Sequence, residues 1–159
     1  SLQYQLLGGK MVVEYAIIEY GYYGIQINVE ADDSSVTIRN NMIRQIVTCG
    51  ICCSPVDPVK ITLSGNDISY CGHEGIATFA ETQINIVNNL LHDNLGGIDG
   101  GGAGVIIDGN SSTISGNSFI GNGTGIYIMG SSNQPVINNN YYEANVHADC
   151  IWADGRPCQ

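Results

Sequence analysis

The stretch of sequence that decides the fold is Ile86-Val-Asn-Asn89-Leu-Leu91. An aliphatic residue is followed by two variable positions and then by an anchor, Asn89, and an apolar residue lies two positions beyond the anchor. Self-similarity at a nearly fixed period is the signature of a repeat architecture. Six segments share the pattern, at 13–18, 38–43, 63–68, 86–91, 114–119 and 137–142, with anchors 23 to 28 residues apart at Ala16, Asn41, Asn66, Asn89, Asn117 and Asn140.

A second landmark follows each anchor, and it is a glycine followed by alternating apolar residues. Gly125-Ile126-Tyr-Ile128 is its clearest copy. Such runs are short, have a period of two and are rich in Ile and Val, which is typical of β-strands. The other copies begin at Gly24, Gly50, Gly75 and Gly104, and Cys150-Ile151-Trp-Ala153 is a degraded last copy.

Short strands at this period leave too few residues between them for crossover helices. The pattern therefore predicts a solenoid of about six coils, each with about three short strands, in one domain over residues 1–159 that could belong to a longer solenoid. The recurring asparagines predict a ladder of stacked side-chain amides. Asparagine would also suit a solvated turn, because it tolerates left-handed dihedral angles. The ladder residues are Asn41, Asn66, Asn89, Asn117 and Asn140.

The charge balance excludes one class of partner. Five Lys and Arg residues stand against fifteen Asp and Glu residues, so the formal net charge is −10. Phosphate binding depends on clustered basic side chains, so we expect no nucleic acid partner. No apolar run approaches the roughly 18 residues of a membrane span, so we expect no membrane partner.

The repeated Ile-x-x-Asn-x-Ile and Gly-Ile-x-Ile segments resemble the right-handed parallel β-helix of pectate-lyase-like and related carbohydrate-active proteins, over roughly residues 11–153. The resemblance implies an all-β fold. It also implies that any chemistry lies on the outer face of each coil's first strand and on the turn before it. Carried over to this sequence, it predicts an outward column of Gln26, Cys52, Ala77, Ile106, Tyr127 and Trp152.

The turns before these strands hold the candidate catalytic residues. Glu74 with Asp93 or Asp99 would supply an acid and a base, and His73 or His92 would assist. Paired carboxylates can cleave glycosidic bonds when their environments separate their pKa values. The alternative is that polar turns of a solvated rod contain such residues in any case. About seven extra residues before Gly104 predict an inserted loop that carries Asp99.

Aromatic residues supply the candidate substrate-binding set, which is Tyr22, Tyr23, Tyr127 and Trp152. Aromatic faces can stack on sugar rings. Together with Ile106, Tyr127 and Trp152 would form an exposed apolar stripe. Such a stripe could equally be a protein interface or be covered by the C-terminal tail.

The six cysteines permit several arrangements. Cys150 could pair with Cys158 and hold down the C-terminal tail, and Cys49 could pair with Cys71. Cys53 is expected to be a small buried hydrophobic residue. A zinc site from Cys49, Cys52, Cys71 and His73 has suitable donors but matches no known ribbon or finger spacing. No cofactor is required by the pattern. Ca²⁺ is the ion that the acidic turns would suit, without assignable ligands.

Two classes of function remain open at this point. One is a carbohydrate-active domain that binds or modifies an extracellular polysaccharide; if it is an enzyme, it would be a hydrolase, lyase or epimerase. The other is a non-catalytic structural or interaction module that associates with itself or with a protein partner. Self-association would use the open solenoid ends or the Ile106/Tyr127/Trp152 stripe. The acidic turns favour a neutral glycan over a polyuronate, and the cysteine content favours export.

Overall fold

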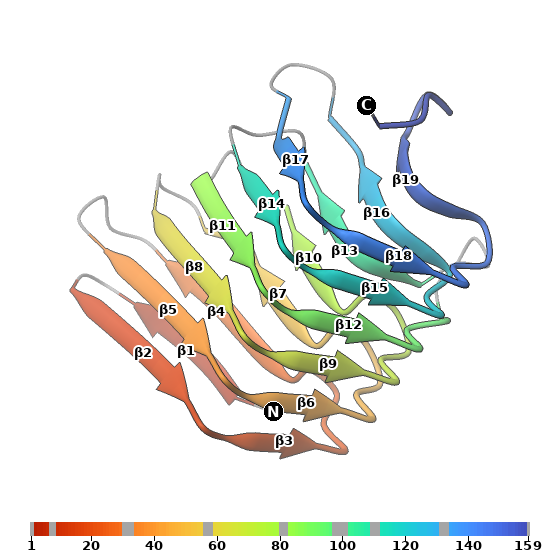
Figure 1. The fold of residues 1–159 in the computed structure, drawn as a ribbon. Coiled ribbons are helices and arrows are strands. Elements are labelled where there is room, and N and C mark those ends of the chain that lie inside the picture. The colour runs from red at the N-terminus through yellow and green to blue at the C-terminus, as the bar shows by residue number, and fades with distance from the viewer. Residues whose placement is uncertain are drawn as a thin grey trace.

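The computed structural model describes residues 2–6, 9–29, 34–55, 59–79, 83–96, 102–108, 112–130 and 134–158. All regular structure within these residues is β-strand, so no described helix could cross a membrane. The strands stack into three parallel sheets that wind around one axis (Figure 1). The fold is thus an all-β parallel solenoid, as the sequence predicts.

Each coil contributes one strand to each sheet. The first sheet contains β1 (Leu2–Leu6), β4 (Ile25–Val29), β7 (Ile51–Cys53), β10 (Ile76–Thr78), β13 (Ala103–Ile107), β16 (Thr124–Ile128) and β19 (Ala148–Trp152). The second contains β2 (Lys10–Glu14), β5 (Ser35–Arg39), β8 (Lys60–Ser64), β11 (Gln83–Val87), β14 (Thr113–Ser115) and β17 (Val136–Asn138). The third contains β3 (Ile17–Glu19), β6 (Met42–Arg44), β9 (Asp67–Ser69), β12 (Leu90–His92), β15 (Ser118–Ile120) and β18 (Tyr141–Glu143).

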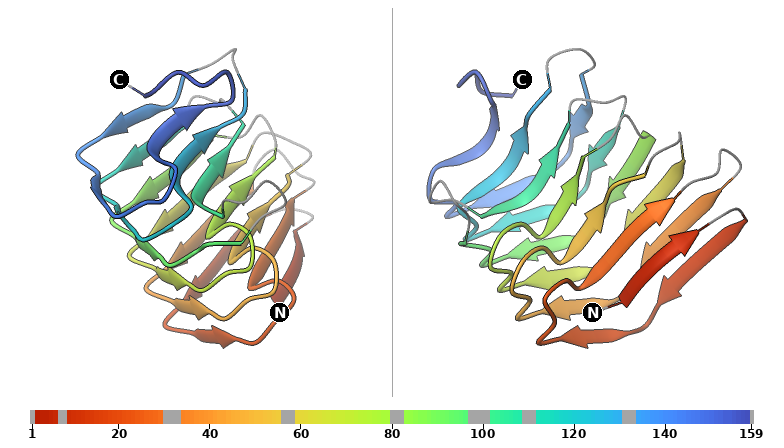
Figure 2. Two further views of the ribbon diagram at one scale, coloured as in Figure 1. Left: turned by 90° about the vertical axis from the view of Figure 1, so that its right-hand side faces the viewer. Right: turned by 180° about the vertical axis from the view of Figure 1, so that it is seen from behind.

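The solenoid has about five turns, whereas the sequence predicts about six coils. An outermost strand at either end of the stack has a neighbour on one side only. The side chains of β17 and β18 are accordingly more exposed than those at the same positions of interior coils. The two ends of the stack lie at opposite sides of the molecule, as both views of Figure 2 show.

The core follows from the two-residue period of the strands, because alternate side chains point inward. Ile25, Ile51, Ile76, Val105 and Ile126 occupy one stacked column of the first sheet, and all are fully buried. Phe119 is the largest fully buried side chain, and it stacks against Tyr142 of the last coil at a ring-centroid distance of 5.4 Å. Burial of this continuous aliphatic column is the main contribution to stability.

The predicted asparagines form a hydrogen-bonded ladder between the second and third sheets. The backbone N–H and Nδ2 of Asn66 both donate to Oδ1 of Asn89 at 2.9 Å. Asn89 donates in the same way to Oδ1 of Asn117, at 2.9 and 3.0 Å. The series extends from Asn41 to Asn140, and each rung satisfies backbone groups that the tight turn leaves unpaired.

A second ladder, absent from the sequence-based prediction, lies at the other end of the third-sheet strands β12, β15 and β18. Asn94 donates to Oδ1 of Asn122, and Asn122 donates to Oδ1 of Asn145. Nδ2 of Asn145 then donates to Asp149 at 3.0 Å, and that contact ends the ladder. The signal for it is an asparagine five residues after each of the anchors Asn89, Asn117 and Asn140.

Candidate functional site

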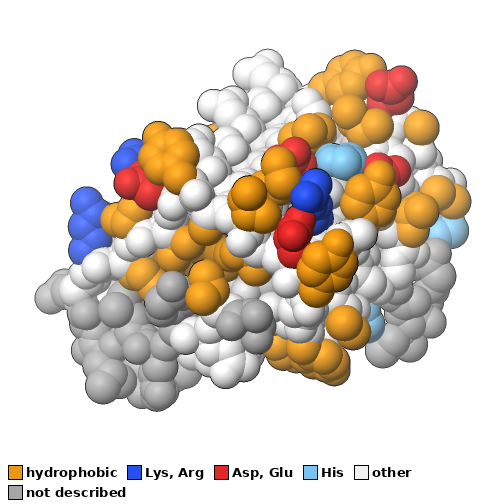
Figure 3. Space-filling model, turned by 90° about the horizontal axis from the view of Figure 1, so that it is seen from below, with side chains coloured by type: hydrophobic (Ala, Val, Ile, Leu, Met, Phe, Trp, Pro, Cys, Tyr) orange, Lys and Arg blue, Asp and Glu red, His pale blue; other side chains and the backbone are white. Residues whose placement is uncertain are grey.

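The outer surface of the third sheet and its two flanking rows of turn residues form what we call the third-sheet face. Each strand here has three residues, the middle one pointing into the core and the outer two pointing outward. Figure 3 looks at the molecule from below, the side on which the third sheet lies. It shows hydrophobic side chains interspersed with acidic, basic and histidine side chains.

A polar cluster lies at the centre of the third-sheet face. Nε2 of His92 is 3.1 Å from Oδ1 of Asp67, and its Nδ1 is 2.8 Å from Oδ2 of Asp93. The ring of Tyr70 meets the imidazole edge-on at a centroid distance of 5.8 Å. His92 is therefore held between two carboxylates from adjacent coils, with its orientation fixed on both sides.

Asp67 is not among the residues that the sequence predicts for the site. It precedes His92 by 25 positions, and in the sheet it pairs with Leu90, two residues before His92. Diagonal neighbours of this kind on adjacent strands are within reach of long side chains. The repeat register is the signal that could identify it, since both residues point outward from β9 and β12.

Exposed tyrosines line the third-sheet face at turn positions of unusual conformation. Tyr15, Tyr20 and Tyr70 have φ angles of 55°, 55° and 52°, in the left-handed region. They are 75%, 76% and 56% exposed, respectively. The left-handed conformation costs a residue with a Cβ atom roughly 1–2 kcal/mol. In the turn of Tyr15 the other coils hold asparagine or glycine. In the turn of Tyr20 and Tyr70 they hold Gln45, Asp93, Gly121 and Ala144, which share the left-handed conformation.

The predicted acid–base residues do not form one hydrogen-bonded cluster among the described residues. His73 and Glu74 lie in the turn that leads from the third sheet to β10. Within the described residues, no hydrogen bond or ion pair joins Glu74 to His92 or Asp93. Asp99 lies outside the described residues. Of the predicted catalytic residues, His92 and Asp93 are hydrogen-bonded to each other, and Glu74 lies beside His73.

Glu74 is partly buried, and burial raises the pKa of its carboxyl group above the usual value, against a smaller opposing effect of His73. Folding then favours the protonated carboxyl group of Glu74. The stability that this protonated group contributes is present in full below the pKa of the unfolded state, and it is lost as the pH rises through the higher pKa of the folded state.

We expect the variant Glu74→Gln to be more stable than the wild type at neutral pH, and we expect this difference in stability to vanish in acid. Urea titrations across pH 3–8, roughly the range in which glutamate titrates, measure this. A constant difference would contradict the assignment.

The face of the first sheet differs from the predicted outward column. Cys52 and Ala77 occupy the column but are buried, because they form a small cluster with Cys49 against which Tyr23 packs. Tyr22 stays exposed and meets Tyr23 edge-on at 5.0 Å. Cys52 and Ala77 themselves are therefore not accessible to a ligand.

The prediction that Trp152 points outward is wrong. In the sheet Tyr127 pairs with Ile151, and Ile128 pairs with Trp152, so Trp152 continues an inward column and is 8% exposed. The last copy is shifted by one residue relative to the predicted alignment, and such a shift exchanges the two faces of a strand. The stripe is accordingly Ile106, Tyr127 and Ile151, whose side chains are half-buried.

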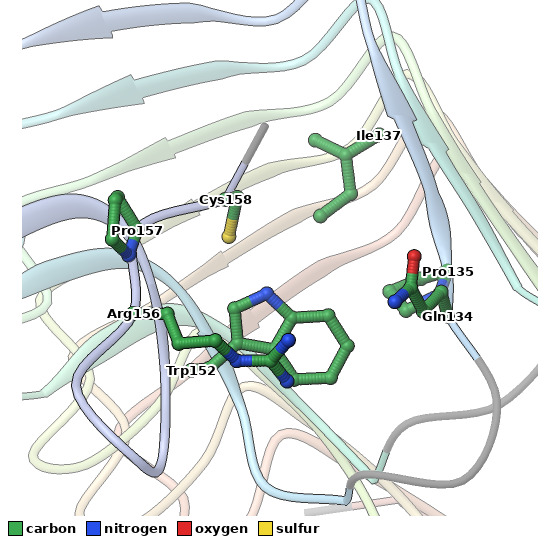
Figure 4. A pocket seen from close by; sticks show the side chains of 7 residues that line it. All are labelled: Gln134, Pro135, Ile137, Trp152, Arg156, Pro157 and Cys158. Carbon is green, nitrogen blue, oxygen red and sulfur yellow. The ribbon is translucent and has the colours of Figure 1, made fainter.

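Two cavities, of about 270 and 290 Å³, lie at the C-terminal end of the solenoid. They share Ile137 and Cys158. Figure 4 shows the first, where the guanidinium group of Arg156 lies over the ring of Trp152, 4.4 Å from its centroid. Arg156 also pairs with Asp154, so its charge is already compensated.

Two disulfides are present. Cys150–Cys158 holds the tail as the sequence suggests, whereas Cys49 pairs with Cys52 and not with Cys71. Cys53 and Cys71 are buried free thiols, and burial raises the pKa of each to about 12. Within the described part of the chain, no group of three or more His, Cys, Asp or Glu side chains is arranged to hold a metal ion. The zinc arrangement is therefore wrong, since two of its four donors are joined in the Cys49–Cys52 disulfide.

Comparison with known proteins identifies the architecture. A family model described as a right handed beta helix region matches residues 4–142. Comparisons with curated proteins and with solved structures found no match.

Proposed function

Because the chain belongs to the right-handed β-helix family, we propose that it binds a neutral extracellular polysaccharide through its third-sheet face. The observation that carries the proposal is the set of exposed tyrosines at left-handed turn positions. Tyr15, Tyr20 and Tyr70 leave their rings in solvent at a conformational cost that glycine or asparagine would avoid. Other coils also hold residues with a Cβ atom in the turn of Tyr20 and Tyr70, so what distinguishes the tyrosines is their exposed rings, which suit contact with a ligand.

The chemistry around the rings favours a sugar. Aromatic faces present apolar surface, and the cluster of Asp67, His92 and Asp93 next to Tyr70 offers oriented donors and acceptors for hydroxyl groups. The two arginines near this face, Arg39 and Arg44, are already paired with Glu14 and Glu19. A polyuronate would therefore meet uncompensated negative charge, whereas a neutral glycan would not.

The repeat supports an extended ligand. Tyr20 and Tyr70 occupy the same turn position two coils apart, which places their backbones on the order of 10 Å from each other along the axis. Rings at fixed spacing along a rod suit a chain of regularly repeating units. An extracellular setting is supported by the two disulfides, which persist in oxidising compartments.

The experiment replaces the rings without disturbing the turns. The variant Tyr20→Asn/Tyr70→Asn keeps residues that tolerate the left-handed conformation, so we expect its thermal stability to equal or exceed that of the wild type. Its affinity for neutral polysaccharides should fall at least about tenfold, since each lost ring contact is worth roughly 0.5–1.5 kcal/mol beyond its buried area. Affinity electrophoresis and pull-down with insoluble glycans measure this.

The matched control is Tyr22→Asn, a tyrosine that is 61% exposed but lies beside the first sheet. It should bind as the wild type does. Loss of binding in the control alone would place the site on the first-sheet side. No binding by the wild type to any neutral glycan would overturn the proposal and favour a structural module. The acid–base roles of Glu74, Asp93, Asp99, His73 and His92 remain predictions, which reducing-end assays on the same glycans test.

A further inference from the structure

Strand β2 is the outermost strand of the second sheet, and its outward edge is unpaired within the described residues. β5 pairs with one side of β2 in parallel, and the other side faces away from the solenoid, at the red end of the chain in Figure 1. An exposed strand edge presents a row of backbone donors and acceptors that can pair with another chain. The edge therefore has the geometry to accept a further strand.

The sequence of β2 is complementary to itself when two copies run antiparallel. It reads Lys10-Met-Val-Val-Glu14. Centred on Val12, such a pair places Lys10 of each copy opposite Glu14 of the other. We propose that two copies of this chain associate through antiparallel pairing of their β2 strands, as a closed symmetric dimer.

The outward side of the pair carries the charge complementarity. Lys10, Val12 and Glu14 are all exposed, and Lys10 has no ion-pair partner among the described residues. Arg39 donates to Oε2 of Glu14, so Oε1 can still accept from Lys10 of the second copy. Opposite charges directly across an antiparallel pair are stabilising, and like charges there are destabilising. Val12, which is 43% exposed, would meet Val12 of the second copy.

The inward side of the pair continues the core. Met11 and Val13 point inward but are less completely buried than Val36 and Ile38, their partners on β5. In the proposed register, Met11 of one copy lies opposite Val13 of the other, so each covers the open end of the other's core. One strand pairing therefore gives the backbone groups at the edge of β2 hydrogen-bond partners, pairs its charged side chains and covers its apolar side chains.

At the opposite end of the solenoid, the C-terminal tail covers part of the edge of β19. There the tail pairs antiparallel with β19, through the Ile151–Pro157 bridge and a 2.9 Å hydrogen bond from Trp152 N–H to the Arg156 carbonyl. The Cys150–Cys158 disulfide holds the tail in place. The tail occupies the edge of β19 at Ile151 and Trp152, with which β1 of a second copy stacked head to tail would have to pair. An isologous β2 contact closes on itself after two subunits.

Sedimentation equilibrium on the full chain tests the proposal. The wild type should be in a monomer–dimer equilibrium without larger species. Lys10→Glu and Glu14→Lys should each raise the dimer dissociation constant at least about tenfold, because each exchanges two ion pairs for two like-charge contacts. An equimolar mixture of the two variants should dimerise again. In the mixed pair, the β2 strand of one variant carries an acidic side chain at both positions and that of the other carries a basic side chain at both.

Two controls separate this contact from general charge effects. Lys60→Glu alters a lysine in the same outward column two coils from the edge and should leave the dimer intact. Arg39→Gln removes the intrachain partner of Glu14 and should also leave it intact. A monomeric wild type, open-ended oligomers, or a dimer unaffected by Lys10→Glu would each overturn the proposal. None of these residues belongs to the tyrosine site, so glycan binding is tested independently.

Discussion

Asn89→Leu is expected to lower the free energy of unfolding by roughly 3–5 kcal/mol, since several buried polar groups lose their partners at once. Oδ1 of Asn89 accepts from the backbone N–H and Nδ2 of Asn66, and Nδ2 of Asn89 donates to the Leu63 carbonyl at 2.9 Å and to Oδ1 of Asn117 at 3.0 Å. Leucine has a similar size but can neither accept nor donate. The buried N–H of Asn66 would then have no acceptor.

Urea denaturation followed by circular dichroism measures the Asn89→Leu effect, with Asn85→Leu as the matched control. Asn85 lies in the same coil, on the exposed side of β11, so the same change there should alter stability by no more than about 0.5 kcal/mol. If both variants unfold at the same urea concentration, the ladder does not contribute to stability as described.

Gly50→Ala is expected to destabilise the protein by about 3 kcal/mol or more, at the upper end of the cost of overpacking. A Cβ atom at this position would lie 2.6 Å from Cγ2 of Ile68 and 2.7 Å from the carbonyl oxygen of Gly75. The second contact is with backbone, which cannot move without disturbing the next coil. The glycines that precede each first-sheet strand are therefore required by the close approach of successive coils.

The control for Gly50→Ala is Gly155→Ala. A Cβ atom at Gly155 meets nothing within 4 Å, but its φ of +85° disfavours alanine. We expect a cost of only about 1 kcal/mol there, from backbone conformation alone. Thermal and urea unfolding of the two variants distinguish the cost of the steric clash from the cost of the backbone conformation. Equal losses of stability in the two variants would argue against the packing explanation.

The site is harder to predict than the fold because its residues come together only across coils. The sequence identifies His92 and Asp93 as reactive side chains in a turn, but their partner Asp67 lies one coil earlier. Tyr70 is a turn residue whose special features are its left-handed φ and its contact with His92, and both belong to the tertiary structure. The pairing of Cys49 with Cys52 also depends on the local path of the chain before β7.

The sequence by itself determined the repeat, the parallel solenoid and the first asparagine ladder. It could do so because the period of the coils and the two-residue alternation of the strands are written in local patterns that recur. Only the tertiary structure decided which surface is open to a ligand. Cys52 and Ala77 are buried on the first-sheet face, and a one-residue shift in the degraded last copy turns Trp152 inward. The first outcome depends on how Cys49 and Tyr23 pack beside the strands. The second depends on the register between coils, which a one-residue ambiguity in the sequence leaves undetermined and packing of the core resolves.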